Sequence, residues 1–170
     1  MPINVVLFEP EIPQNTGNII RTCVATNTKL HLIEPLGFDL YKKDVKRSTA
    51  NHLEGLNYQT YCNYEEFVKL NEGEYFFITR YATKNPNEFK FDDYSKNIYL
   101  IFGKESSGLP YELLKDHLEQ CIRIPMSAQA RSLNLSNCVA IMVYDLLKQF
   151  DYESLSLFEV QKGKDFLNNI

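Results

Sequence analysis

The chain has 170 residues, a mass of 19.8 kDa and a formal net charge of −4, with 44% hydrophobic and 24% charged residues. These values predict one globular domain over residues 1–170 and exclude a disordered or collagen-like chain. No apolar run approaches the roughly 18 residues that cross a bilayer, and residues 1–13 lack the basic segment and cleavage site of a signal peptide, so we expect a cytoplasmic protein without a membrane partner.

Strands and helices are expected to alternate along the chain. Apolar and β-branched runs predict strands at 3–8, 30–34, 59–62, 75–79, 97–102 and 121–124. Helical spacing predicts helices at 15–27, 42–50, 64–70 and 137–150, with a short helix opened by Pro110. Asn15, Asn63 and Ser136 are the expected N-caps. The alternation indicates an α/β fold with a mostly parallel sheet and flanking helices, followed by a C-terminal tail at 151–170.

Cysteine and histidine spacing argues against a metal centre. The four cysteines, at positions 23, 62, 121 and 138, form no CxxC pair, and the three histidines show neither HExxH nor zinc-finger spacing. The sequence therefore predicts reduced, mostly buried thiols and no bound metal.

One basic stretch stands out in an otherwise acidic chain. A pI near 5.4 has the wrong sign for a generic nucleic-acid binder, but binding depends on local patches. The segment KKDVKR at 42–47 contains Lys42, Lys43, Lys46 and Arg47 and has a local charge of +3. It is either an RNA-binding face or a solvated helix face.

Three polar segments follow predicted strands, where parallel sheets bind ligands: 14–21, 102–110 and 124–137. None is a phosphate loop, a dinucleotide fingerprint or a nucleophile elbow. Segment 14–21 is either a phosphate site at a helix N-terminus or a capped helix with a surface ion pair. Segment 102–110 is either a loop lining a ligand or a turn before Pro110. Segment 124–137 has more serines and asparagines than one cap requires, which favours a polar ligand.

Together these segments resemble the motifs of SPOUT-class RNA methyltransferases, in the branch that methylates the ribose 2′-OH of the tRNA wobble nucleotide. The matching stretches are FEPEIPQNTGNIIR at 8–21, HLIEPLGF at 31–38, FGKESSGLP at 102–110, IRIPM at 122–126 and RSLNLSNCVAI at 131–141. Residues 80–82, RYA, and 127–130, SAQA, depart from the family pattern. The resemblance covers about 150 residues, everything before the tail.

The resemblance implies an α/β domain with a C-terminal trefoil knot that binds S-adenosylmethionine. Gly103 is expected to let the backbone approach this ligand closely, because glycine has no Cβ. The residues that match the cofactor site are Ile78, Thr79, Phe102, Gly103, Ile124, Met126, Ser132, Leu133 and Asn134.

The same resemblance implies catalytic roles for Asn15, Arg21, Glu105 and Tyr144, and an RNA contact for Arg131. A guanidinium stays protonated in proteins, so we expect Arg21 to position the substrate and stabilise charge rather than act as a general base. Tyr144 either hydrogen-bonds the target nucleotide or is a half-buried packing residue.

The expected partners are the anticodon arm of tRNA, with leucine tRNAs as recipients, and a second copy of the chain. A two-fold pair would double the basic stretch and bring Arg21 of one subunit to the cofactor of the other. We expect the dimer surface to be the apolar stripe of helix 137–150, made of Val139, Met142, Val143, Leu146 and Leu147, unless that stripe is internal core.

Two alternatives stay open at this point. One is a 2′-O-methyltransferase acting on another tRNA site or on ribosomal RNA. The other is a non-catalytic RNA- or nucleotide-binding module on the same fold; the presence of Arg21, Glu105 and Asn134 argues against it.

Overall fold

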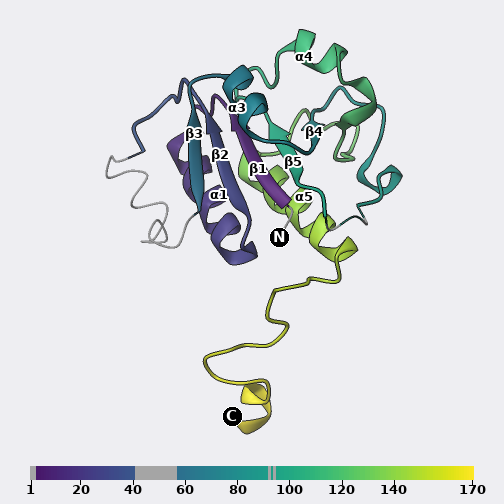
Figure 1. Cartoon of the computed structure of the whole chain (residues 1–170). Helices are drawn as coiled ribbons and strands as arrows, with labels where there is room; N and C mark the ends of the chain where they lie inside the picture. The colour runs from purple at the N-terminus through teal and green to yellow at the C-terminus, as the bar shows by residue number, and fades with distance from the viewer. Residues whose placement is uncertain (1–2, 41–56, 92, 94) are drawn as a thin grey trace.

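Six strands form one parallel sheet in the computed structural model, which describes residues 3–40, 57–91, 93 and 95–170 (Figure 1). The strand order is β3-β2-β1-β5-β4-β6, and every pairing between these strands is parallel. The strands are β1 (Ile3–Phe8), β2 (Lys29–Ile33), β3 (Tyr58–Tyr61), β4 (Glu74–Ile78), β5 (Ile98–Phe102) and β6 (Cys121–Ile122). The predicted α/β sheet is confirmed; the trefoil knot stays a prediction, and the expected helix 42–50 lies outside the described residues.

The middle of the sheet is fully buried, as its apolar sequence predicts. All six residues of β1 are buried, and Val5 pairs with Leu30 of β2 on one side and Leu100 of β5 on the other. Strands covered on both faces contain continuous apolar runs rather than alternating ones. This explains why INVVLF and IYLIF are buried along their whole length.

Helices cover both faces of the sheet. Helices α1 (Pro13–Thr26) and α5 (Leu135–Gln149) pack beside each other against one face, and α3 (Tyr64–Leu70) and α4 (Tyr111–Lys115) cover the other (Figure 1). Short 3-10 turns are η2 (Pro86–Glu88), η3 (Leu118–Gln120) and η4 (Phe166–Asn169). The core therefore consists of two apolar clusters separated by the sheet.

Two of the three predicted N-caps are wrong. Helix α1 begins at Pro13, which suits a first turn because that position needs no N–H donor, so Asn15 lies inside the helix and is buried. Helix α5 begins at Leu135 because the Asn134 side chain accepts from the Ser136 N–H at 2.9 Å, making Asn134 the cap. Asn63 is confirmed as the cap of α3, accepting from the Glu66 N–H at 2.8 Å.

The apolar stripe of α5 is internal core. Its five residues are fully buried against the sheet and α1 within a single chain, which excludes this stripe as a dimer surface. The outward side of α5 presents other apolar groups, Ile141 and Tyr144, which are 44% and 47% exposed. Any contact between two copies through α5 therefore involves this outward side.

The C-terminal tail leaves the body of the protein. Tyr152 and Leu155 still pack against the core, whereas the rest of the chain to Ile170 runs away from the sheet and is mostly exposed (Figure 1). Two cysteines are buried and Cys138 is partly so, but Cys62 is exposed. No described helix has the length and apolar character required to cross a bilayer.

Candidate functional site

A cavity of about 450 Å³ opens at the carboxyl ends of β1, β4, β5 and β6. Its wall is formed by the loops that follow β4, β5 and β6 and by the first turn of α1. The strand order reverses between β1 and β5, and ligands of open parallel sheets bind at such a reversal. The three polar segments identified in the sequence thus meet at one place.

All nine residues assigned to cofactor binding line this cavity, as do Asn15 and Glu105. The apolar part of the wall includes Ile78, Phe102, Ile124 and Leu133, and the polar part is rich in loop backbone and small side chains. The sequence reasoning did not include Ile12, Arg80, Tyr81 and Cys138, which also line the cavity. Arg80 and Tyr81 directly follow Thr79 in the loop after β4. Their position in this loop is the one feature of the sequence that indicates a place at the cavity.

A chain of hydrogen bonds joins the three segments. Asn15 donates from Nδ2 to Glu105 Oε1 at 3.0 Å, and Asn134 donates from Nδ2 to Asn15 Oδ1 at 2.9 Å. These residues are 90 and 119 positions apart in sequence. The chain fixes the start of α1, the loop after β5 and the cap of α5 relative to one another, and thereby sets the shape of the cavity.

The Glu105 carboxylate lies at the N-terminal end of α1. It accepts from the backbone N–H groups of Glu11 at 2.8 Å and Ile12 at 3.2 Å, as well as from Asn15. An anion at this end of a helix is stabilised by unpaired N–H groups and by the helix dipole. Because the protein supplies this anion itself, the end of α1 is not the phosphate site considered from the sequence.

A reciprocal contact strengthens the same junction. The Glu11 carboxylate accepts from Ser106 N–H and Oγ–H, both at 2.9 Å, while Lys104 forms an ion pair with Glu9. The hydrogen bonds from Ser106 lower the pKa of Glu11 below its usual value, with its backbone N–H as the largest cause. The loop after β5 is therefore held to the segment before α1 by polar contacts in both directions.

The structure gives a further reason for Gly103, within the loop itself. A Cβ at this position would lie 2.2 Å from the Gly108 carbonyl carbon and 2.3 Å from the Leu109 nitrogen. The missing side chain therefore makes room for the loop's own backbone, where Lys104 and Gly108 exchange hydrogen bonds. Gly103 shapes the cavity wall by letting this loop fold back tightly.

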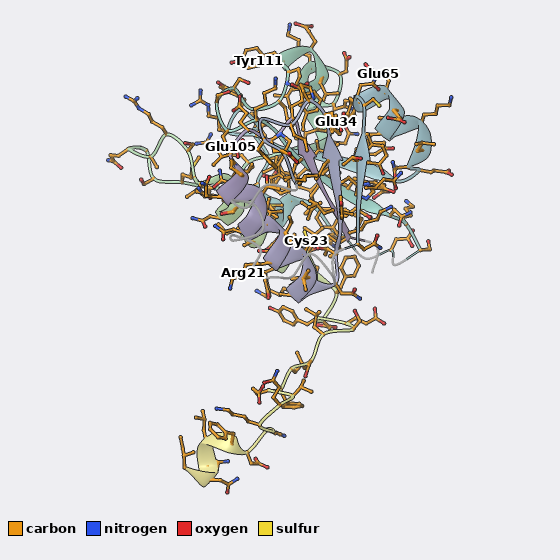
Figure 2. The ribbon with its side chains drawn as sticks, turned by 90° about the vertical axis from the view of Figure 1, so that its left-hand side faces the viewer. Arg21, Cys23, Glu34, Glu65, Glu105 and Tyr111 are labelled. Carbon is orange, nitrogen blue, oxygen red and sulfur yellow. The ribbon has the colours of Figure 1, made fainter. Side chains whose placement is uncertain are left out.

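Arg21 and Tyr144 lie apart from the cavity. They line a separate hollow between the outward sides of α1 and α5, together with Asn18, Thr22, Val24 and Ala25. Arg21 lies two turns into α1, and Figure 2 shows it well below Glu105, which is at the upper end of that helix. No described carboxylate lies within ion-pair distance of Arg21, so the surface ion pair considered from the sequence is not observed.

One other expected site residue is described, and it contributes to neither hollow. Arg131 is exposed in the loop before α5 and lines neither the cavity nor the hollow at Arg21. Lys42, Lys43, Lys46 and Arg47 lie outside the described residues. Within the described part of the chain, no three metal-ligating side chains gather in one place.

Comparisons with known proteins give the site its context. Residues 2–144 match the model of a family described as the SpoU rRNA Methylase family. A relative from Geobacillus stearothermophilus, provisionally named a tRNA (cytidine(34)-2′-O)-methyltransferase, is 46% identical over 157 residues, covering 92% of this chain and 100% of the relative. The tRNA (cytidine(34)-2′-O)-methyltransferase of Yersinia pestis is 42% identical, covering 92% of this chain and 99% of its own.

Solved structures agree with these sequence matches. A structure described under "Structural insights into the 2-OH methylation of C/U34 on tRNA" superposes with a TM-score of 0.83 at 32% identity, covering 90% of this chain and 100% of that one. An AdoMet-bound rRNA methyltransferase from Sinorhizobium meliloti superposes with a TM-score of 0.74 at 26% identity, covering 86% of this chain but 56% of that one. The whole chain up to the tail thus has counterparts of the same fold.

Proposed function

The chain belongs to the SpoU rRNA methylase family, and we propose that it transfers a methyl group to the ribose 2′-OH of the first anticodon nucleotide of tRNA. The observation that supports this most directly is the Glu105–Asn15–Asn134 chain, which joins three sequence segments around one cavity. The names of the relatives identify the nucleotide as position 34. The full coverage of the tRNA-linked structure, against 56% of the rRNA enzyme, favours tRNA over ribosomal RNA.

The cavity fits S-adenosylmethionine. Its volume of about 450 Å³ is within the range of ordinary ligand pockets. Ile78, Ile124 and Leu133 provide apolar surface for an adenine ring, and the loop backbone at Gly103 provides polar atoms for the rest of the nucleoside. When bound, the cofactor supplies the methyl group. Glu105, Asn15 and Asn134 would hold the loops around it.

Arg21 would act on the RNA rather than on the cofactor. Its guanidinium is exposed, has no carboxylate partner among the described residues and is permanently charged. These properties suit binding of a phosphate and orientation of the neighbouring 2′-OH, with Tyr144 beside it to hydrogen-bond the nucleotide.

Because Arg21 and the cavity are separate within one chain, we propose that the active site is completed in a homodimer. The exposed sides of α1 and α5, with Arg21, Ile141 and Tyr144, would face the partner in place of the buried stripe. Arg21 of one subunit would then reach substrate at the cavity of the other. The tRNA anticodon arm would be bound across both subunits, in the cytoplasm, with Arg131 and the basic stretch 42–47 as further RNA contacts.

The function is tested with purified protein, methyl-labelled S-adenosylmethionine and tRNA transcripts. We expect 2′-O-methylation of nucleotide 34 and of no other position. Leucine tRNAs are the recipients that the SPOUT resemblance favours, and mapping 2′-O-methylation in total tRNA from cells lacking the gene checks that choice. Methylation elsewhere in tRNA or of ribosomal RNA, or no cofactor binding in calorimetry, would refute the proposal.

Replacing Arg21 separates catalysis from cofactor binding. Arg21→Ala should lower turnover by on the order of a hundredfold, about 2.7 kcal/mol, while cofactor affinity stays within a few-fold. Arg21→Lys should restore turnover only in part, because an ammonium cannot reproduce the planar guanidinium. The matched control is Lys90→Ala, which removes another exposed cation with full activity expected. Wild-type turnover in Arg21→Ala would rule out the role.

A further inference from the structure

Two exposed tyrosines stand beside the cavity and have no role in the proposed chemistry. Tyr81, in the loop after β4, lines the cavity and is 51% exposed. Tyr111, the first residue of α4, is 60% exposed and lies in the upper part of the molecule, above Glu105 in Figure 2. Exposed aromatic side chains gathered at the mouth of a pocket are typical of a binding surface.

The two rings form an ordered pair. Their centroids are 5.6 Å apart with planes at 71°, and their hydroxyl oxygens are 3.2 Å apart. Arg80 donates to the Tyr81 hydroxyl at 2.6 Å and places its guanidinium carbon 4.8 Å from the centre of that ring. The edge-to-face contact and Arg80 each cover only part of the ring surface, and the two tyrosines remain 51% and 60% exposed. The rings are thus held in place while keeping free aromatic surface.

The charge around the pair is positive. Arg80 lies over the Tyr81 ring, and Arg123 donates to the backbone carbonyl of Arg80, which brings a second guanidinium to the residue before Tyr81. Neither forms an ion pair with a carboxylate of the described residues, whereas the nearby acids Glu112 and Glu119 are each paired with a lysine. We define Arg80, Tyr81, Tyr111 and Arg123 as the tyrosine–arginine cluster.

We propose that the tyrosine–arginine cluster binds an unpaired nucleobase of the substrate RNA, adjacent to the nucleotide that enters the cavity. Unpaired RNA bases are recognised by stacking on aromatic rings and guanidinium planes, with cations contacting the backbone. An anticodon loop offers such bases on both sides of its first nucleotide. This inference depends on the proposed function, because it is tRNA methylation that brings a single-stranded loop to this cavity.

A nucleobase could also come from the cofactor's adenine, and burial favours the RNA. Ile78 and Ile124, both half-buried, form part of the apolar wall of the cavity, whereas Tyr81 lines the same cavity and is 51% exposed. The adenine ring can therefore bind against the apolar wall of the cavity without contacting the tyrosines. The cluster faces the solvent from which RNA approaches.

The test uses the full-length protein and an anticodon stem-loop RNA that has cytidine at position 34 and the fluorescent base 2-aminopurine at a neighbouring nucleotide. Stacking on tyrosine quenches this fluorescence. Tyr81→Ala and Tyr111→Ala should each raise the Kd for the RNA about tenfold, the scale of one lost stack, and remove the quenching. Tyr81→Phe and Tyr111→Phe should keep both within about twofold, because the rings are retained. Affinity for S-adenosylmethionine, measured by calorimetry, should not change.

Phe158→Ala is the matched control. Phe158 is an exposed aromatic residue with the Lys164 ammonium 4.6 Å from its ring centre, but it lies in the tail away from the cavity. This variant should bind RNA like the wild type.

Unchanged RNA affinity and quenching in the alanine variants would overturn the inference, as would an equal loss of cofactor affinity, which would assign the rings to adenine. If those variants methylate tRNA and bind RNA like the wild type, the proposed role of the tyrosine–arginine cluster is wrong and the proposed reaction is unaffected. Quenching that depends on the tyrosines, without methylation by the wild type, would overturn the proposed reaction and leave the cluster standing.

Discussion

At the scale of single residues, the loop after β5 depends on the absence of one side chain. Gly103 is in close contact with the backbone of Gly108 and Leu109, and the neighbouring Glu105 and Ser106 attach the same loop to the segment before α1. A change at Gly103 must therefore move a cavity wall.

Gly103→Ala should lower cofactor affinity by about tenfold or more, since a distortion worth about 1.4 kcal/mol of binding energy is sufficient. The cause is steric, because the added Cβ would meet loop backbone at 2.2 Å. Calorimetric titration measures the effect. Gly163→Ala is the control: a Cβ there meets nothing within 4 Å, and the strain from its φ of +88° is confined to the tail. Wild-type affinity in Gly103→Ala would show that the loop does not shape the cofactor site.

His31 is a second residue whose environment has a measurable consequence. It is buried in the sheet, with Nδ1 at 2.7 Å from the Tyr61 hydroxyl and Nε2 at 3.2 Å from Asn4 Oδ1. Burial, followed by the charge of Lys29, lowers the pKa of His31 to about 3 from a usual value of 6.5. It is thus a neutral core histidine.

Acid should destabilise the protein through His31. Between pH 6.5 and 3 the unfolded chain binds a proton that the folded chain does not, so the free energy of unfolding falls as pH decreases. From pH 7 to pH 5 the expected loss is about 2 kcal/mol. Urea unfolding of the wild type and of His31→Asn at both pH values checks this. An equal loss in the variant would assign the pH effect to other groups.

At the scale of elements, α5 has two faces with different roles. Its inward stripe is fully buried against the sheet and α1, whereas Ile141 and Tyr144 face outward next to the hollow that contains Arg21. Substitutions on the inward face should therefore change the stability of the fold, and substitutions on the outward face should change self-association.

Leu146→Ala should lower the free energy of unfolding by about 3 kcal/mol, because it leaves a cavity in the core. Ile141→Ala should change monomer stability by less than about 0.5 kcal/mol and weaken self-association. Urea unfolding and sedimentation at several concentrations measure the two effects. The opposite result would contradict these roles of the two faces of α5. In that case folded Leu146→Ala would lose self-association and Ile141→Ala would retain it.

At the scale of the whole molecule, the cavity proposed for the cofactor and Arg21 are on different parts of the surface. The first lies beyond the carboxyl ends of the strands, and the second on the outward side of α1, eight residues or about 12 Å along the helix from its first residue. A site divided in this way predicts that two subunits cooperate in each reaction.

Mixing two impaired variants tests this cooperation, at a cofactor concentration low enough to leave the Gly103→Ala cavity almost empty. In a dimer of one Arg21→Ala and one Gly103→Ala subunit, the intact cavity of the first meets the intact Arg21 of the second. Random mixing in equal amounts should restore about a quarter of wild-type activity, since half of the dimers are mixed and each has one complete site. If Arg21 served its own subunit's cavity, the mixture would show no activity above its separate components.

The strands, the main helices and the polar segments around the cavity can be predicted from local sequence alone. Continuous apolar runs gave a parallel sheet, and polar segments after β1, β5 and β6 marked the cavity, because local composition and spacing are sufficient for such features. Asn63 was recognisable as a cap since its partner Glu66 is three residues away. Pro13 also carries a local signal for the start of α1, because proline suits the first turn of a helix, and this signal competes with that of Asn15.

How those segments meet depends on the packing of the whole chain. The contacts of Asn15 with Glu105 and Asn134 span 90 and 119 residues, and no local period encodes such a distance. The apolar stripe of α5 faces the core because the sheet and α1 cover it. The sequence of the stripe alone does not distinguish a core face from a dimer interface. The separation of Arg21 from the cavity and the pairing of Tyr81 with Tyr111 likewise depend on chain packing, which brings together or separates residues irrespective of their spacing in sequence.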